Sequence, residues 1–149
     1  MSVVHDTFVI ERVYDASPER VYAAWSDPKA KGQWFAGPDD GQDSNHELDF
    51  RVGGKERLSG GLPDGPTYSY EATIQDIVPN ERIIYAYEMH LDAKRISVSV
   101  ATIEFHDIDQ KTRLVVTEQG AYLDGLDDPR QREQGTKELL DALNLFLQG

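Results

Sequence analysis

The sequence closes with DPRQREQGTKELLDALNLFLQG (residues 128–149), and this stretch predicts a long helix over Pro129–Gln148. Asp128 is a good N-cap residue, and Pro129 suits the first helical position. Apolar residues then recur at three- and four-residue spacing, namely Leu139, Leu140, Ala142, Leu143, Phe146 and Leu147. Such a stripe is typical of a helix that buries one face against a sheet.

The first half of this predicted helix is mostly polar and contains Gly135. A glycine in a helix interior costs about 1 kcal/mol relative to alanine. We therefore expect a compensating feature at Gly135, either the close approach of another backbone or a bound molecule.

The remainder of the chain predicts one strand, two short helices and six further strands. Ser17-Pro18 and Asp27-Pro28 are cap-and-proline pairs that each start a short helix, the second ending near Phe35. The expected strands are Phe8–Tyr14, Glu47–Val52, Lys55–Ser59, Tyr68–Val78, Arg82–His90, Ile96–Phe105 and Thr112–Gln119. Residues 37–44 and 60–66, rich in Gly, Pro and Asp, predict loops. Strands joined by short turns favour an antiparallel sheet, so the sequence predicts an α+β domain whose single sheet is covered by the last helix.

Composition limits the possible functions. A chain of 149 residues suits a single domain spanning residues 1–149, and 15 basic against 27 acidic residues give a net charge of −12. Such a charge disfavours nucleic acid as a partner. The absence of cysteine excludes disulfides and thiolate sites, and no apolar run approaches the roughly 20 residues of a membrane span. No basic and apolar leader is present at Met1–Thr7, so we expect a cytoplasmic protein.

Glu118 has an unexpected place in the strand pattern. Leu114 and Val116 alternate onto one side of their strand, and strict alternation puts Glu118 on that same apolar side. A carboxylate buried there without a partner would have a raised pKa or would cost stability. Two interpretations stay open: Glu118 belongs to a functional site, or a bulge, the strand end or a cation such as Arg12 gives it a structural role.

Aromatic residues gather in adjacent predicted strands. Tyr68, Tyr70, Tyr85 and Tyr87 occur in two neighbouring strands, and Trp34-Phe35 ends the second short helix. Aromatic side chains with a polar tip suit a pocket for an amphipathic molecule, but the same residues also suit a solid core.

Catalytic and metal-binding motifs are scarce. The four histidines, His5, His46, His90 and His106, lie in separate segments without a second ligand at helical or strand spacing. The sequence contains no nucleophile elbow, phosphate-binding loop or dinucleotide fingerprint. It therefore predicts no metal site and no cofactor, and it identifies no nucleophile.

Several motifs in order resemble those of the family related to the activator of Hsp90 ATPase. They are TRLVVTEQG (residues 112–120), Gly135-Thr136 with the leucines that follow, YDASPERVYAAWSDP (residues 14–28) and Trp34. This family is part of the START-like, or SRPBCC, superfamily with the Bet v 1-type helix-grip fold. The resemblance implies a curved seven-stranded sheet around the last helix, with a cavity between them that other members use for apolar molecules.

One departure from the family pattern concerns the cavity. The family often has Gly-Trp where this chain has Gly135-Thr136, so a pocket here is expected to lack that aromatic wall. The eukaryotic activator also contacts its chaperone through additional segments, for which 149 residues leave no room.

The function expected from the residues and the resemblance is binding of a small apolar or amphipathic ligand. The alternatives are a cyclase-like or hydrolase-like enzyme that uses a pocket carboxylate, and an interaction module that activates Hsp90. The candidate cavity residues are Trp34, Phe35, Tyr70, Tyr85, Tyr87, Phe105, Glu118, Leu139 and Leu143. Val98 and Val100 alternate onto the opposite, solvent side of their strand, which predicts a homodimer.

Overall fold

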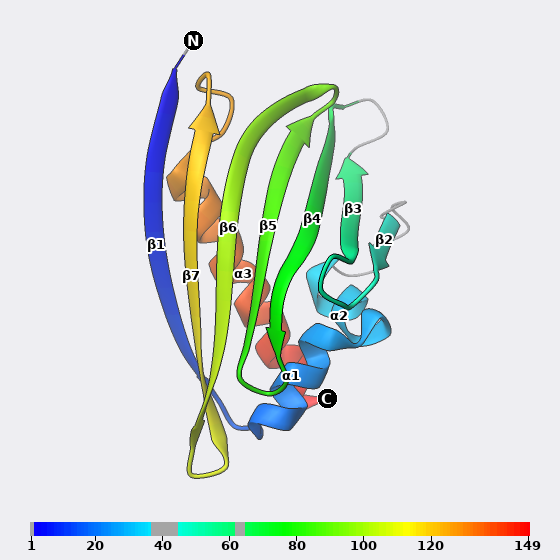
Figure 1. Ribbon diagram of the computed structural model, residues 1–149, viewed down its shortest axis with the longest axis vertical. Coiled ribbons are helices and arrows are strands. Elements are labelled where there is room, and N and C mark those ends of the chain that lie inside the picture. Colours follow the sequence, from blue (N-terminus) through cyan, green and yellow to red (C-terminus); the bar gives the residue numbers. More distant parts are fainter. Residues whose placement is uncertain (1, 37–44, 62–64) are drawn as a thin grey trace.

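The computed structural model describes residues 2–36, 45–61 and 65–149, and they form an α+β fold. Seven strands make one antiparallel sheet, and three helices accompany it (Figure 1). The elements are β1 (Val3–Tyr14), α1 (Pro18–Ser26), α2 (Pro28–Phe35), β2 (Asn45–Leu48), β3 (Lys55–Gly61), β4 (Thr67–Val78), β5 (Arg82–Leu91), β6 (Lys94–Ile108), β7 (Lys111–Leu123) and α3 (Pro129–Gln148). The predicted loop 37–44 and positions 62–64 of the predicted turn lie outside the described residues.

The sheet has the order β1-β7-β6-β5-β4-β3-β2. Each strand after β2 therefore pairs with its predecessor along the chain, and β1 closes the far edge by pairing with β7. The strands curve around α3, which runs along one face of the sheet, while α1 and α2 lie near one end of it (Figure 1). This is the predicted helix-grip arrangement, and the structure confirms it.

All three helices begin at the cap-and-proline pairs that the sequence predicts. Ser17 Oγ accepts a hydrogen bond from the Arg20 amide at 3.3 Å, and Asp27 Oδ1 accepts one from the Lys29 amide at 3.3 Å. Asp128 Oδ1 accepts from the Arg130 amide at 2.9 Å. These side chains bind amides that have no partner within the first helical turn.

The second half of α3 is held against the sheet and α1. Leu140 and Leu143 are 1% and 0% exposed. The Tyr14 hydroxyl of β1 donates to the Leu140 carbonyl at 2.9 Å, and Arg20 Nη2 of α1 donates to the Leu147 carbonyl at 2.7 Å. The helix is therefore fixed by apolar burial and by two side-chain hydrogen bonds to its backbone.

The predicted strand Glu47–Val52 is wrong in its second half. Pairing of β2 stops at Leu48, and the chain then turns, with the Asp49 amide bonded to the Lys55 carbonyl at 2.9 Å. The Gly53 amide next bonds the Ile74 carbonyl of β4 at 2.8 Å. This segment thus makes turn contacts with β4 in place of a longer strand pair.

Strands β6 and β7 are longer than predicted and form a tight hairpin. Ile108 pairs with Lys111, so only Asp109 and Gln110 connect the strands. Both residues have positive φ, at 52° and 71°, as a type I′ turn requires. No helix in the described ranges is both long enough and apolar enough to cross a bilayer.

Candidate functional site

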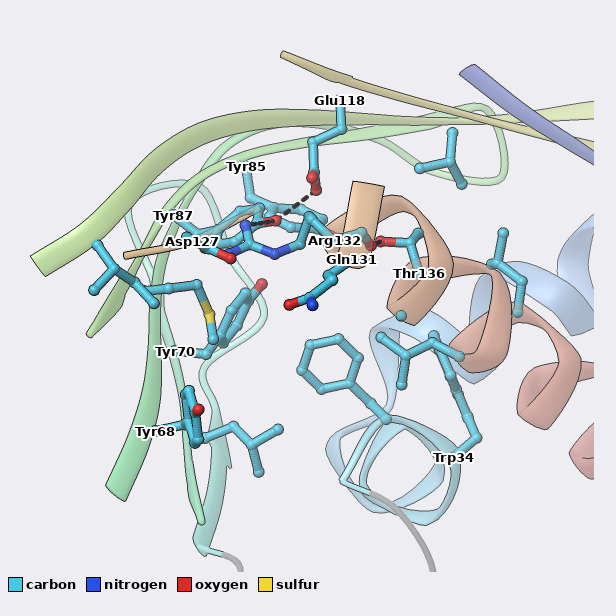
Figure 2. Close-up of a pocket in the computed structure, with 18 of the residues that line it drawn as sticks. Trp34, Tyr68, Tyr70, Tyr85, Tyr87, Glu118, Asp127, Gln131, Arg132 and Thr136 are labelled. Atoms are coloured by element: carbon cyan, nitrogen blue, oxygen red, sulfur yellow. Dashed lines mark hydrogen bonds and ion pairs between the residues drawn. The ribbon is translucent and has the colours of Figure 1, made fainter. Parts of the chain in front are cut away.

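A pocket of about 320 Å3 lies between the concave face of the sheet and α3 (Figure 2). Its walls come from α1, α2, β3 to β7, the β7–α3 turn and the part of α3 that ends at Leu140. The lining residues are Trp25, Trp34, Phe35, Leu58, Tyr68, Tyr70, Tyr85, Tyr87, Met89, Ile96, Val116, Glu118, Asp127, Gln131, Arg132, Gly135, Thr136, Leu139 and Leu140. Most of these side chains are aromatic or aliphatic, so the wall is largely apolar.

Tyrosines of β4 and β5 form one wall. Tyr70 and Tyr87 have ring centroids 4.9 Å apart, and Tyr85 and Tyr87 have centroids 6.1 Å apart. Strand alternation directs all three side chains to the concave face. Phe35 at the end of α2 packs edge-on against Tyr70 at 5.2 Å. Tyr68, which is 49% exposed, also lines the pocket and brings it to the surface.

The polar half of α3 forms the opposite wall. No heavy atom lies within 4 Å of the place where a Cβ on Gly135 would be, apart from its chain neighbours and the helix's own backbone. The expected close approach of another backbone is therefore wrong, and Gly135 faces the pocket. Thr136 Oγ1 donates to the Arg132 carbonyl within the same helix at 2.9 Å, and the Thr136 side chain also lines the pocket.

Glu118 lies on the concave face, as strict alternation indicates. In the sheet it pairs with Phe8 of β1 and Ala101 of β6, and it is 4% exposed. The interpretation in which a bulge or strand end returns it to solvent is wrong. Arg12 is not its partner either, since Arg12 Nη2 lies 3.7 Å from Asp141 Oδ1.

Arg132 is the centre of the polar end of the pocket. Its Nη1 donates to the Tyr87 hydroxyl at 3.0 Å, and its Nη2 donates to Ser97 Oγ at 3.1 Å. It also forms an ion pair with Asp127. The Tyr87 hydroxyl in turn donates to Glu118 Oε1 at 2.6 Å, as the dashed lines in Figure 2 show. The guanidinium charge is thus compensated by Asp127, and Tyr87 links it to Glu118.

The environment changes the protonation of these groups. Burial raises the pKa of Glu118 above its ordinary value, although the Tyr87 hydrogen bond and the Arg132 charge act in the opposite direction. Burial also holds the pKa of Tyr87 well above its ordinary value, so this hydroxyl keeps its proton. Among the described residues, Glu118 Oε2 has no hydrogen-bond partner.

A second buried polar group lies beside the pocket. Lys31 Nζ of α2 is 2.7 Å from Glu56 Oε1 of β3, and His46 Nε2 is 2.8 Å from Glu56 Oε2. Tyr70, which lines the pocket, donates to Glu56 Oε1 at 3.3 Å. Burial alone would raise the pKa of Glu56, but Lys31 and His46 outweigh burial and lower it. This carboxylate is therefore a partnered charge, in contrast to Glu118.

Comparison with known proteins decides the family. Residues 15–148 match the family described as Activator of Hsp90 ATPase homolog 1-like protein. The chain belongs to this family. Its fold is the helix-grip fold of the SRPBCC superfamily, as the sequence motifs imply. No curated protein matches the sequence.

Solved structures of similar proteins share the fold over nearly the full chain. A putative uncharacterized protein from Rhizobium leguminosarum is 49% identical with a TM-score of 0.94, covering 99% of this chain and 97% of that one. The Mll3558 protein from Rhizobium loti is 41% identical with a TM-score of 0.90, covering 98% and 99%. Protein CV1439 from Chromobacterium violaceum is 27% identical with a TM-score of 0.80, covering 96% and 97%.

Most of the candidate residues from the sequence lie together in this family member. Trp34, Phe35, Tyr70, Tyr85, Tyr87, Glu118 and Leu139 all line the pocket. Phe105 and Leu143 do not line it. They belong to the packed core, where Phe105 meets Tyr22 edge-on at 5.6 Å.

Sequence reasoning missed the polar partners of Glu118. Arg132 stands three and seven residues before Gly135 and Leu139, so all three share one face of α3. This spacing places Arg132 on the same helix face as the apolar stripe. It was the signal in the sequence that could have identified Arg132 as a pocket residue. Met89 follows Tyr85 and Tyr87 at alternating positions of one predicted strand, so alternation was the signal for it. Asp127 carried no comparable signal, because the turn that places it is a tertiary feature.

One group of side chains outside the pocket has the spacing of a cation site. In the described part of the chain, Glu71, Glu88 and His90 bring ligand atoms within 4.8 Å of one another. They alternate with pocket-facing residues and so lie on the convex face. Glu88 is already bonded to His90 at 2.8 Å and paired with Arg95 at 3.4 Å, which explains their proximity without an ion.

Proposed function

We propose that this protein binds a small apolar or amphipathic molecule in the pocket between the sheet and α3. The observation that carries the proposal is the composition of that pocket. One side is a wall of tyrosine and other apolar side chains, and the far end holds a nearly fully buried carboxyl oxygen without a partner among the described residues. An apolar wall with a few convergent polar groups is the usual form of a ligand site.

The size of the pocket supports a small ligand. Its volume of about 320 Å3 lies at the lower end of the range for ligand pockets, roughly 300–1,000 Å3. The small residues Gly135 and Thr136 leave this space on the side of α3. Filling that side should therefore prevent binding.

Equilibrium dialysis with 2-isopropylnaphthalene, an apolar probe of suitable size, tests this proposal. Thr136→Trp places an indole in the pocket and is expected to reduce affinity at least tenfold. Leu145→Trp is the matched control, because Leu145 is 70% exposed on the outer side of the same helix. Equal binding by the two variants, or no binding by the unmodified protein, would contradict the proposal.

A second candidate function is an enzyme that uses Glu118. The specific observation is a buried carboxyl group with a raised pKa that is hydrogen-bonded to Tyr87 at 2.6 Å, an arrangement suited to general acid or base chemistry. For a substrate found by screening, Glu118→Gln should abolish turnover and preserve binding. Unchanged turnover in that variant would eliminate this candidate.

A further inference from the structure

The polar end of the pocket is a directed chain of hydrogen-bond donors. Arg132 Nη1 donates to the Tyr87 hydroxyl at 3.0 Å, and that hydroxyl donates to Glu118 Oε1 at 2.6 Å. Because an arginine has no acceptor, Arg132 is the donor to Tyr87, and the single proton of the Tyr87 hydroxyl is left to be donated to Glu118. Oε1 is thereby used as an acceptor, and Oε2 is the carboxyl oxygen without a partner among the described residues.

Glu118 lines the pocket, and its Oε2 is a buried polar atom. The side chain is 4% exposed, lines the pocket and points towards its interior in Figure 2. Within the described part of the chain Oε2 has no hydrogen-bond partner, and neither has the buried Ser99 Oγ. Ser99 pairs with Tyr87 on one side and Gly120 on the other, so it lies on the same concave face near Glu118.

Burial raises the pKa of Glu118, and in the neutral acid the proton would lie on Oε2, because Oε1 accepts from Tyr87. The groups that face Glu118 are Tyr85 and Tyr87 of β5, Tyr122 of β7, Asp127 of the turn and Arg132 of α3. Its strand neighbours on the same face are uncharged, namely Phe8 of β1 and Ala101 of β6. Because Asp127 already neutralises Arg132, an ionised Glu118 would leave a net negative charge in an apolar pocket.

We propose that Glu118 Oε2 donates a hydrogen bond to the carbonyl oxygen of an uncharged ligand whose apolar body packs against the tyrosine wall. This inference rests on the proposed function and names its ligand class. A ligand that fills the pocket excludes water from Glu118, which further favours the protonated acid. The same charge balance disfavours a carboxylate ligand, because no uncompensated cation is present among the described lining residues.

Three naphthalene probes of similar shape separate the possibilities. 2-Acetonaphthone has a carbonyl oxygen, 2-isopropylnaphthalene has none, and 2-naphthoate has a charge. In equilibrium dialysis with the full chain, the ratio of ketone affinity to hydrocarbon affinity is expected to fall about 3- to 10-fold in Glu118→Leu, the range for one hydrogen bond. Glu118→Gln should keep the ratio, since its amide still donates.

The pH dependence gives a second readout. In the unmodified protein the ketone-to-hydrocarbon ratio should fall as pH rises through the raised pKa of Glu118, because ionisation removes the donor. In Glu118→Gln the ratio should not change with pH. This readout does not depend on the leucine variant folding normally.

Each outcome decides between the two proposals. If both neutral probes bind but their ratio is unaffected by Glu118→Leu and by pH, the carbonyl inference is wrong and the binding function stands. A glutamine variant that loses the ketone preference, or tightest binding of 2-naphthoate, also overturns the inference. If no probe binds, the binding function itself fails and the inference fails with it.

Discussion

At the scale of single residues, Glu118 and Glu56 are two buried carboxyl groups whose pKa values are shifted in opposite directions. Glu56 has Lys31 and His46 as partners, and its pKa is lowered. Within the described ranges Glu118 has only the Tyr87 hydroxyl as a direct partner, and its pKa is raised. A buried charge without compensation costs stability, so Glu118 is the group for which a functional reason is needed.

The raised pKa predicts that Glu118→Gln stabilises the protein in a pH-dependent way. The folded state binds the Glu118 proton more tightly than the unfolded state does, so this contribution is fully present below the ordinary pKa and is lost as pH rises through the folded pKa. Glutamine does not titrate. Thermal unfolding should therefore show a Tm gain in the variant at pH 8, with about 2–4 °C expected per kcal/mol, and little gain at pH 4. A gain that is larger at pH 4 would contradict the assigned direction.

The Lys31–Glu56 pair predicts a large effect of removing one charge. Both side chains are nearly fully buried, so Lys31→Met removes the lysine charge beside Glu56, leaves only His46 to compensate it among the described residues, and should lower the free energy of unfolding by about 3–5 kcal/mol. The double variant Lys31→Met/Glu56→Gln removes both charges and should recover part of this loss. Urea unfolding measures both values. Equal stability of the single and double variants would show that the ion pair is not the cause.

At this scale the sequence predicted the position of Glu118 but not its partners. Alternation from Leu114 placed it on the concave face, whereas Tyr87 and Arg132 reach it from β5 and α3 only through tertiary packing. Phe105 and Leu143, which the sequence also predicts for the cavity, lie on inward faces but belong to the packed core. An inward face holds both packed and pocket-lining residues, and their spacing alone does not distinguish the two.

At the scale of elements, α3 has two different halves. Its second half is buried core, and its first half is a pocket wall that contains a glycine with open space at its Cβ position. The predicted boundaries of this helix are confirmed because its cap, proline and terminal glycine are all local signals. The second half of the predicted strand 47–52 is wrong because its backbone forms local turn bonds, such as that of the Arg51 amide to the Asp49 carbonyl at 3.0 Å.

Gly135→Ala tests separately the effect of this position on helix stability and its effect on the space for a ligand. The added methyl meets no other atom within 4 Å, so the helix should gain up to about 1 kcal/mol from the lost flexibility of glycine. Urea unfolding should show this gain, while dialysis should show that 2-isopropylnaphthalene still binds, since one methyl fills little of the pocket. A destabilised variant would mean that the position is more crowded than the structure shows.

At the scale of the whole molecule, the family membership and the fold are established, and the partners stay predictions. The convex face of the sheet exposes Val98 and Val100, at 43% and 40%, which is the basis for the expected homodimer. The net charge of −12 opposes self-association. Activation of Hsp90 rests on the family resemblance alone and is tested by adding the protein to an Hsp90 ATPase assay.

Sedimentation equilibrium tests the homodimer prediction. If the convex face is the interface, the unmodified protein sediments as a dimer and Val98→Glu/Val100→Glu sediments as a monomer. Leu145→Glu is the matched control, because it adds a charge to an exposed position on α3 and should leave the dimer intact. Monomeric behaviour of the unmodified protein at high concentration would refute the prediction.

The central claim, that a small apolar molecule occupies the space between the sheet and α3, is tested most directly by methyl NMR. The chain has two methionines, Met1 and Met89, and Met89 lines the pocket. In protein labelled with 13C at the methionine methyl groups, titration with 2-isopropylnaphthalene should move the Met89 resonance strongly through the ring current of the probe. The Met89 resonance should not move in Thr136→Trp at the same probe concentrations. A Met89 resonance that stays unchanged in the unmodified protein at saturating probe would contradict the account.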